Sequence, residues 1–432
     1  MNAPELYDRY LITSMVAGFE PIVVERAAGC TIVGSDGREY LDCFSGIATV
    51  NAGHGHPRVL AAAREQMDKL VHCGTYVYYN PRAAELARRL AEVTPDGLQK
   101  TFFCNSGAEA IEGAVRLAKQ FTKRRELLAL SLSFHGRTAG TLSITGNRGR
   151  KKGFGPYLAG VAFAPAPYCY RCPLKLSYPQ CGVACADFID HVLRYQTAGE
   201  VAAFVAEPVL GEGGIIVPPP EYFKRAVEIV RNDGALFITD EVQSGFGRTG
   251  RLFAIEHYGV EPDILCLAKG IADGWPLGAF IARPEVADAF TPGDHLSTFG
   301  GNPVCCAAAL ANIAVMQEEQ LSARAAARGA ELFARLSALA EAHPLIGDVR
   351  GKGLMIGVEL VRDAAKTPAD AEAKELRRLC REAGLLLGLG GALGNVLRFQ
   401  PPLVISPEET GRAADIFATA LGALGATREP RY

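Results

Sequence analysis

The stretch that decides the fold is Leu236–Gly270, LFITDEVQSGFGRTGRLFAIEHYGVEPDILCLAKG. We expect a buried strand at Leu236–Thr239 that leads into Asp240, and a second buried strand at Ile264–Ala268 that leads into Lys269. Continuous apolar runs of this length are typical of parallel sheets, in which ligands bind beyond the carboxyl ends of the strands. Asp240 and Lys269 are therefore predicted to lie at one edge of one sheet and to face one crevice.

The chemistry of these two side chains indicates a cofactor. A lysine that follows an apolar strand is partly desolvated, which lowers its pKa and makes Lys269 a candidate Schiff-base amine. A carboxylate at the neighbouring strand end can keep a pyridine nitrogen protonated, as pyridoxal phosphate (PLP) requires. The sequence therefore predicts a PLP site in which Lys269 and Asp240 are the catalytic residues.

Length and composition bound the class of protein. The 432 residues exceed one typical core, and a formal net charge of −2 gives no reason to expect nucleic acid or an anionic membrane as partner. The apolar window 384–396 is too short for a membrane span and is broken by glycine. The first residues carry neither a basic nor an apolar signal region, so a cytoplasmic location is predicted.

Strands and helices alternate through the central part of the chain, which is typical of a doubly wound α/β domain. We predict an arm and part of a small domain at 1–50, a large cofactor-binding domain at 51–324, and a small α+β domain at 325–432. The large domain is predicted to have strands at Thr101–Cys104, Leu127–Leu132, Val201–Ala206, Leu236–Thr239, Ile264–Ala268 and Ala279–Ala282, and helices at Glu109–Phe121, Pro220–Asn232 and Val304–Glu318.

A candidate phosphate site is Asn105–Ala110, NSGAEA, which follows a predicted strand and opens a predicted helix. Small residues at a helix N-terminus let backbone N–H groups approach a phosphate, and the helix dipole favours the anion. An ordinary cap supplied by Asn105 or Ser106 would have the same sequence. The motif gains weight from its combination with Lys269 and Asp240.

Two further strand ends carry candidate site residues. Phe134 could stack on a planar cofactor ring and Arg137 could bind a substrate carboxylate, although a core phenylalanine and a surface arginine would look the same. Glu207 ends the strand VAAFVA and would share the crevice with Asp240. Gln243 could donate an amide hydrogen bond to a ring oxygen, or it could simply be a solvated turn residue.

Gly245–Gly250 fits the dinucleotide fingerprint G-x-G-x-x-G. In a dinucleotide site the strand leads directly into a long helix. Here residues 240–244 intervene and only a short segment follows, so we reject a nicotinamide site.

Four of the twelve cysteines form a cluster, C-x2-C-x8-C-x3-C, at Cys169, Cys172, Cys181 and Cys185. Cysteines in such a cluster could hold zinc or an iron–sulfur centre. Only the first half has knuckle-like spacing, however, and the four thiols could equally pack a compact loop. We therefore predict no metal site and leave this alternative open.

Together, eight motifs resemble those of the class III (ω-) aminotransferases of PLP fold type I, in the same order and over nearly the whole chain: NSGAEA, FHGRT, AEPVLGEGG, ITDEVQSGFGRTG, LAKG, STFGGNP, GDVRGKGLMIGVEL and LRFQPPL. The resemblance implies a mostly parallel sheet of the seven-stranded type in a large domain, with a smaller α+β domain. It also implies a homodimer with shared active sites, and a tetramer stays open.

The resemblance also implies roles for individual residues. Lys269 would form the Schiff base with PLP, and Asp240 would be the partner of the pyridinium nitrogen. Ser106, Gly107 and Ala108 would bind the phosphate, together with Thr298 of the neighbouring subunit. Gln243 would contact the ring hydroxyl, and Val242 and Phe134 would pack on the two ring faces. The predicted site also includes His135 and Glu207.

For the substrate, Arg398 resembles the arginine that takes the carboxylate of the 2-oxo acid, and Glu207 resembles the gate that covers this arginine. Ile47 and Arg137 suit members that act on 4-aminobutyrate, whereas FSGIATVNAGHGHP is most similar to alanine–glyoxylate members. Phe19 and Ile47 stand where ornithine-type members carry aromatic residues (a tyrosine at the first), and this counts against ornithine.

The implied activity is transfer of an amino group, by a ping-pong mechanism, from an alanine-, 4-aminobutyrate- or β-alanine-type donor to 2-oxoglutarate, pyruvate or glyoxylate. An acetylornithine-type aminotransferase stays open. A racemase or epimerase on the same scaffold also stays open, because it would keep both Lys269 and Asp240.

Overall fold

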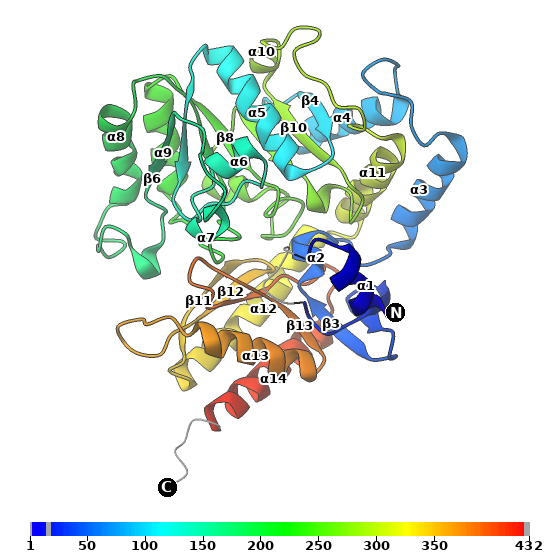
Figure 1. Cartoon of the computed structure of the whole chain (residues 1–432), viewed down its shortest axis with the longest axis vertical. Helices are drawn as coiled ribbons and strands as arrows, with labels where there is room; N and C mark the ends of the chain where they lie inside the picture. The colour runs from blue at the N-terminus through cyan, green and yellow to red at the C-terminus, as the bar shows by residue number, and fades with distance from the viewer. Residues whose placement is uncertain (1, 14–18, 427–432) are drawn as a thin grey trace.

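The computed structural model describes residues 2–13 and 19–426, and two sheets of seven strands organise them (Figure 1). In the first sheet the order is β4-β10-β9-β8-β7-β5-β6. Strand β10 pairs antiparallel with both of its neighbours, and the other neighbouring strands pair in parallel. These strands are β4 (Lys100–Cys104), β5 (Glu126–Leu130), β6 (Val161–Ala164), β7 (Val201–Ala206), β8 (Leu236–Asp240), β9 (Ile264–Leu267) and β10 (Gly278–Ala282). The predicted mostly parallel α/β fold is confirmed.

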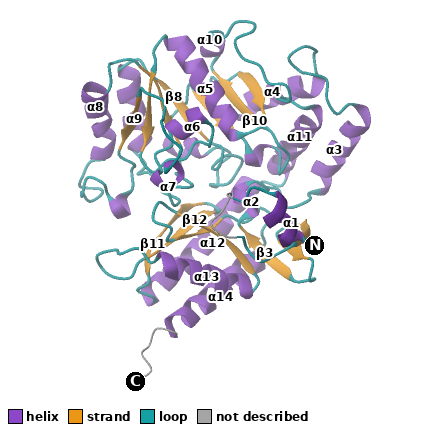
Figure 2. Ribbon diagram, in the orientation of Figure 1, coloured by secondary structure: helices purple, strands orange, loops and turns teal. Residues whose placement is uncertain are grey.

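Helices cover both faces of this sheet, which explains why the central strand β7 is apolar and buried at every position (Figure 2). Alternate residues of the central strands belong to two separate cores: Val205 packs in the core with α5, whereas Phe237 packs against Phe223 of α9, with tilted rings whose centroids are 5.7 Å apart. The helices of this part are α3 (Pro57–Lys69), α4 (Pro81–Val93), α5 (Gly107–Thr122), α6 (Ala139–Ser143), α7 (Arg148–Lys151), α8 (Ala184–Gln196), α9 (Tyr222–Asn232), α10 (Pro284–Ala287) and α11 (Pro303–Glu318).

The second sheet joins both ends of the chain, in the order β1-β2-β3-β13-β14-β12-β11. Figure 1 shows the blue β3 beside the orange β13, and these strands pair in parallel with Leu41 opposite Leu385. The strands are β1 (Val24–Ala28), β2 (Thr31–Gly34), β3 (Glu39–Cys43), β11 (Ile346–Lys352), β12 (Met355–Leu360), β13 (Leu385–Gly390) and β14 (Val396–Phe399); with them go α1 (Ala3–Tyr10), α2 (Ser45–Ala48), α12 (Leu321–Ala342), α13 (Asp370–Glu382) and α14 (Pro407–Ala426). The predicted domain limits at residues 50 and 324 stay a prediction.

The Gly245–Gly250 stretch is a run of turns that leads into the short 3-10 helix η2 (Ala254–Tyr258), so it lacks the helix a dinucleotide site needs. Its Arg248 is fully buried and donates hydrogen bonds to the carbonyl of Leu354 (3.2 Å), to the carbonyl of Pro401 and to Asn51 Oδ1 (2.6 Å). This arginine therefore ties the turn after β8 to the part of the chain that carries the second sheet.

Within residues 2–13 and 19–426, no helix combines the length and the apolar character that crossing a membrane requires.

Candidate active site

A cavity of about 190 Å³ opens where β7, β8 and β9 end. The sheet register explains its composition, because Ala206 lies opposite Thr239 and Asp240 lies opposite Cys266, so the residues that follow are neighbours. The cavity is lined by Gly107, Ala108, Phe134, His135, Gly136, Glu207, Glu212, Asp240, Val242, Gln243 and Lys269. The site residues predicted from the sequence that are in this group thus lie together around one cavity. Their individual roles stay predictions.

Lys269 follows β9 and begins the 3-10 helix η3 (Lys269–Ile271). Its φ of +46° lies in the left-handed region, which is strained for a lysine and is held by the surrounding structure. Burial lowers the pKa of Lys269, although Glu212, Asp240 and Glu207 act in the opposite direction. A lowered pKa raises the fraction of neutral amine, which suits a nucleophile.

Asp240 is buried and is oriented by two hydrogen bonds. Its Oδ2 lies 2.7 Å from His135 Nδ1, and its Oδ1 accepts from the Val242 amide at 3.0 Å. Burial disfavours a charged imidazole, yet the hydrogen bond that His135 donates to Asp240 and the charges of Asp240 and Glu207 raise the pKa of His135. His135 and the Val242 amide therefore fix the orientation of the Asp240 carboxylate at the inner end of the cavity.

The N-terminus of α5 forms one wall of the cavity. Ser106 is the N-cap, and its Oγ accepts from the Glu109 amide at 3.2 Å. A Cβ on Gly107 would lie 2.7 Å from Val242 Cγ1, so only glycine lets the helix end approach Val242 this closely. The start of this 16-residue helix, where backbone amides point outward, suits an anionic group.

These features fit PLP. The N-terminus of α5 can bind the phosphate, and Asp240 can bind the ring nitrogen. Lys269 can form a Schiff base with the aldehyde. The Oε1 of Gln243 accepts from Gln400 Nε2 at 3.1 Å, which leaves the Gln243 amide nitrogen as its donor for a ring oxygen. His135 Nε2 is buried and lacks a partner among the described residues, so it is a further donor or acceptor at this end of the cavity.

Arg398 lies on β14 of the second sheet and is buried. It stands opposite Gly388, and a Cβ on Gly390 would lie 3.0 Å from its Nε, so these glycines make room for the guanidinium. Its Nη1 donates to Glu212 Oε1 at 2.5 Å. The predicted Glu207–Arg398 pair is therefore wrong for this structure, in which Glu212 is the carboxylate that covers Arg398.

Glu207 has other partners. Its Oε1 accepts from the Phe134 amide at 2.9 Å and its Oε2 from the Gly211 amide at 2.8 Å, so both oxygens are used. Burial raises the pKa of Glu207 to about 7. Glu207 thus holds two cavity loops together and is not free to reach Arg398.

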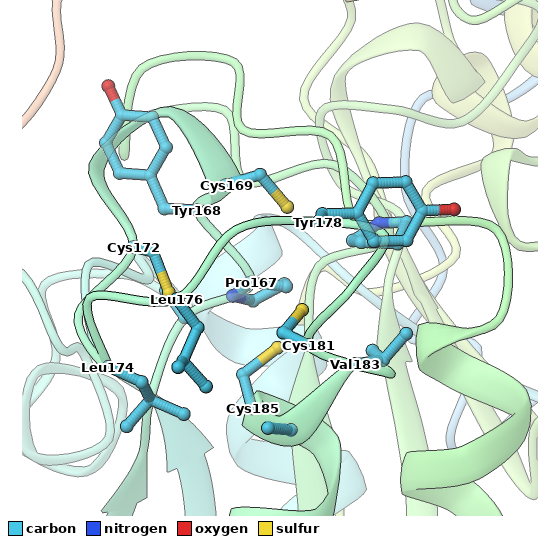
Figure 3. A pocket seen from close by; sticks show the side chains of 13 residues that line it. Pro167, Tyr168, Cys169, Cys172, Leu174, Leu176, Tyr178, Cys181, Val183 and Cys185 are labelled. Atoms are coloured by element: carbon cyan, nitrogen blue, oxygen red, sulfur yellow. The ribbon is translucent and has the colours of Figure 1, made fainter.

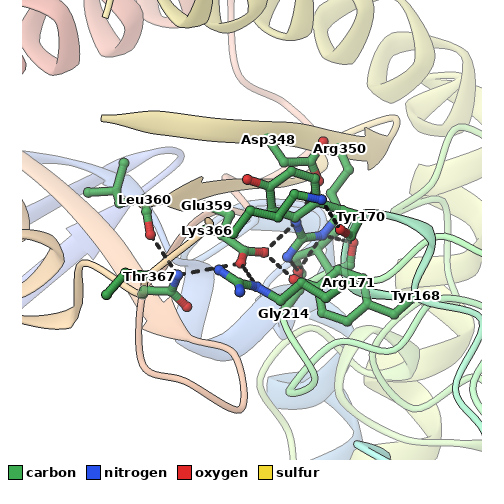
Figure 4. Close-up of polar contacts among 12 residues, drawn as sticks. Tyr168, Tyr170, Arg171, Gly214, Asp348, Arg350, Glu359, Leu360, Lys366 and Thr367 are labelled. Atoms are coloured by element: carbon green, nitrogen blue, oxygen red, sulfur yellow. Dashed lines mark hydrogen bonds and ion pairs between the residues drawn. The ribbon is translucent and has the colours of Figure 1, made fainter. Parts of the chain in front are cut away.

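The loop that carries Glu212 is fastened to the second sheet by a polar cluster (Figure 4). Arg350 of β11 donates from Nη2 to the carbonyl of Gly214 at 2.6 Å and from Nη1 to Glu359 at 2.8 Å. Glu359 of β12 also pairs with Arg171 at 2.5 Å, in the cysteine-bearing loop. This cluster fixes the position of the Glu212 loop relative to the strands next to Arg398.

Several predicted residues do not line the cavity. Ser106, Arg137 and Thr298 are exposed, and the Arg137 guanidinium lies 5.9 Å from the centroid of the Phe134 ring. Ile47 lies in the short α2, where its φ of +68° is not helical, and it is 38% exposed. Their roles in cofactor or substrate binding stay predictions.

The four clustered cysteines line a separate small pocket and are all free thiols (Figure 3). The rest of this pocket includes Pro167, Leu174, Leu176 and Val183. Among the residues that the structure describes, no group of three or more His, Cys, Asp or Glu side chains is placed to hold a metal ion.

The model of the aminotransferase class-III family matches residues 14–421. The chain belongs to the class III aminotransferases. It is 41% identical to an acetylornithine aminotransferase of Methanothermobacter thermautotrophicus over 94% of this chain and 95% of the relative, and 40% identical to a leucine/methionine racemase of Thermococcus litoralis over 96% and 94%. A probable 4-aminobutyrate aminotransferase of Bacillus subtilis is 36% identical over 96% of each chain.

Solved structures agree with this assignment. An ω-transaminase of Pseudomonas jessenii in complex with pyridoxamine phosphate superposes with a TM-score of 0.94, at 28% identity over 100% of both chains. A PLP-bound amine transaminase of an uncultivated Pseudomonas species has a TM-score of 0.89, at 34% identity over 97% of this chain and 98% of that chain. This family member is a PLP-dependent enzyme.

The sequence interpretation missed two residues of this site, Glu212 and Arg150. Arg150 Nη2 donates to Glu212 Oε2 at 2.8 Å. Although burial favours the neutral acid, Arg398 and Arg150 lower the pKa of Glu212 to about 2. The motif AEPVLGEGG contains both glutamates, and nothing in its spacing says which one faces the arginine.

Proposed function

We propose that this aminotransferase moves an amino group from an alanine-, 4-aminobutyrate- or β-alanine-type donor to 2-oxoglutarate, pyruvate or glyoxylate by a ping-pong mechanism. The observation that carries the proposal is the Glu212–Arg398 pair beside the cavity. An arginine covered by a movable carboxylate accepts a substrate carboxylate when uncovered, and presents a neutral pair to a donor that places no carboxylate there. Alternation between two substrate classes is what ping-pong transamination needs.

When bound, PLP would supply an electron sink for the substrate carbanion. The other tasks fall to this chain. Lys269 would carry the proton to and from the substrate carbon as general base and acid. Asp240, fixed by His135, would hold the ring nitrogen protonated. Gly107 and Ala108 would hold the phosphate, and Val242 and Phe134 would keep water away from the ring faces.

We also propose a homodimer with shared active sites, with a tetramer left open. Large apolar side chains are exposed on two adjoining segments, Tyr76, Val77, Tyr78 and Tyr79 on one and Leu296 and Phe299 on the other. The segments adjoin because Thr75 Oγ1 donates to the carbonyl of Gly300 at 2.5 Å. An exposed apolar patch next to Thr298 suits a second copy of the chain. Sedimentation of the holoenzyme tests this, and a monomer at micromolar concentration would refute it.

The proposed activity has a direct test. The holoenzyme is mixed separately with L-alanine, 4-aminobutyrate, β-alanine, L-ornithine and N-acetyl-L-ornithine. A true donor converts the absorbance of bound PLP to that of pyridoxamine phosphate, and a 2-oxo acid restores it. The first three donors are expected to react. A response to N-acetyl-L-ornithine alone would replace this proposal with the acetylornithine-type activity named in one relative. A place in amino-acid metabolism rests on this outcome, and the predicted cytoplasmic location stays a separate proposal.

A racemase is the second candidate, because a relative that is 40% identical is named a leucine/methionine racemase. Incubation of L-leucine, L-methionine or L-alanine in D2O separates the two activities. Racemisation exchanges the α-hydrogen and forms the D-enantiomer without any 2-oxo acid, whereas transamination forms a 2-oxo acid and stops when the acceptor is withheld.

A further inference from the structure

Glu212 is held by two arginines at once. Arg398 Nη1 donates to its Oε1 at 2.5 Å, and Arg150 Nη2 donates to its Oε2 at 2.8 Å. The Arg398 side chain is 4% exposed and that of Glu212 is 11% exposed, whereas Arg150 is 37% exposed. The carboxylate thus bridges a buried guanidinium and one at the solvent side. The three residues come from different elements: β14, the loop after β7, and α7.

Arg398 has an unused hydrogen-bond donor. Its Nε is buried and lacks a partner among the described residues, whereas its Nη2 makes only a long hydrogen bond, of 3.4 Å, to the carbonyl of Leu389. A guanidinium carries five N–H donors in a fork that matches a carboxylate. A substrate carboxylate can therefore bind Arg398 in a forked geometry, provided that Glu212 leaves Nη1.

When Glu212 leaves Arg398, its negative charge needs another cationic partner. A buried carboxylate that loses its only cation is strongly unfavourable, because the desolvation cost is no longer offset. Glu212 avoids this state because Arg150 already binds its second oxygen. A rotation about the carboxylate can then bring both oxygens to Arg150, whose exposed side allows it to move.

We propose that Arg150 is a specificity-determining residue that retains Glu212 when a substrate carboxylate takes Arg398. The proposal rests on the proposed function and deepens it. With a donor that places no carboxylate here, Glu212 bridges both arginines. With a 2-oxo acid, Glu212 pairs with Arg150 alone and Arg398 binds the substrate. Two substrate classes are thus admitted without an unpaired buried charge.

The first test compares two half-reactions of the holoenzyme, one with a primary amine that lacks a carboxylate and one with pyruvate. In Arg150→Met, Glu212 has only Arg398 as its arginine partner and therefore leaves it less readily. The kcat/KM for pyruvate relative to that for the amine is expected to fall about tenfold, which corresponds to the loss of one charge-assisted hydrogen bond. Arg148→Met is the matched control, because Arg148 is exposed on the same helix α7. An equal change for both substrates, or no change, would overturn the proposal.

The second test asks whether Arg150 acts through Glu212. In a Glu212→Gln background there is no carboxylate to retain, so adding Arg150→Met is expected to change the pyruvate-to-amine ratio by less than about twofold. A tenfold effect that persists in this background would mean that Arg150 touches the substrate or supports the fold, and the proposal would fail.

The third test needs no turnover. Calorimetric titration of the PLP-loaded enzyme with 2-oxoglutarate, in the absence of amine, is expected to show about tenfold weaker binding in Arg150→Met than in the unsubstituted enzyme. Unchanged binding would overturn the role of Arg150. If the unsubstituted enzyme binds 2-oxoglutarate but transaminates no donor, the proposed function fails while this role is still decided by the titration. If it does not bind 2-oxoglutarate at all, the role fails as well.

Discussion

The two sheets contribute to the site in different ways. The first sheet brings Glu207, Asp240 and Lys269 to one cavity because its parallel strands end at one edge. The second sheet brings Arg398, on a strand with antiparallel neighbours. The residues suited to the cofactor thus come from local strand ends, whereas the residue suited to a substrate carboxylate comes from a sheet built from both ends of the chain.

This difference predicts separable functions. Changes to the residues of the first sheet that line the cavity should lower turnover of every substrate alike. Changes in the second sheet should alter which substrates are accepted. Glu212 connects the two, because its loop follows β7 and its carboxylate pairs with Arg398.

The largest effect is expected at Lys269. Its lowered pKa and its place in the cavity make it the predicted nucleophile and proton carrier. Lys269→Ala should lower kcat by a factor on the order of 10⁴ for every donor, measured by 2-oxo acid formation. The exposed Lys224 supplies the control variant Lys224→Ala, which should keep full activity. Transamination by Lys269→Ala at the unsubstituted rate would refute the assignment.

The next effect is expected at Arg398. Arg398→Met should lower kcat/KM for pyruvate about 100-fold relative to a primary amine without a carboxylate, because a buried charge-assisted pair is lost. Arg398→Lys keeps the charge but loses the fork, and an intermediate ratio is expected. Steady-state kinetics with both substrates measure the ratio. Equal losses for both substrates would show that the second sheet does not act on specificity alone.

Much of the first sheet could be predicted from the sequence because each strand is its own apolar run, flanked by turn residues. Asp240 and Lys269 followed from one rule, that parallel strands end at a common edge. The run at Val161–Ala164 was missed because four residues followed by a proline-rich loop carry little periodicity. The local sequence pattern was sufficient to predict elements whose structure depends on residues that are close in the sequence.

The carboxylate partner of Arg398 could not be predicted in this way. Glu207 and Glu212 lie five positions apart in one motif, and Arg398 lies 186 positions after Glu212 on another sheet. The choice depends on the backbone amides of Phe134 and Gly211, which occupy both oxygens of Glu207. Arg150 was missed for the same reason, since its helix has only four residues and its partner is remote in sequence.

A smaller effect is expected at Gly390 of β13. A Cβ there would lie 3.0 Å from Arg398 Nε and 3.1 Å from Cζ, so Gly390→Ala should displace the guanidinium. We expect KM for pyruvate to rise roughly threefold to tenfold, with little change in kcat for the amine. Gly422→Ala, at a helical position where a Cβ meets nothing within 4 Å, is the matched control. An unchanged KM in Gly390→Ala would show that Arg398 tolerates movement.

The smallest effect concerns stability at the edge of the first sheet, next to Asp240. Burial raises the pKa of Glu241 to about 7 from its ordinary 4.5, although Ser244 Oγ (2.5 Å) and the Ile255 amide (2.7 Å) stabilise its charged form. Because the folded state binds this proton more tightly than the unfolded state, its contribution is fully present below about pH 4.5 and is lost as pH rises through about 7. The free energy of unfolding should therefore decrease between these pH values.

Glu241→Gln isolates this contribution, because glutamine keeps an oxygen for the Ile255 amide and has no proton to lose. The decrease in the free energy of unfolding between pH 5 and pH 7.5 should be smaller in the variant by up to roughly 3 kcal/mol, measured by urea denaturation of the holoenzyme. Glu341→Gln, at an exposed position of α12, should leave the pH dependence unchanged. Substrate ratios should stay the same in both variants, since Glu241 does not line the cavity. An altered pyruvate-to-amine ratio in Glu241→Gln would mean that the edge of the first sheet also influences substrate specificity. The two sheets would then not have separable functions.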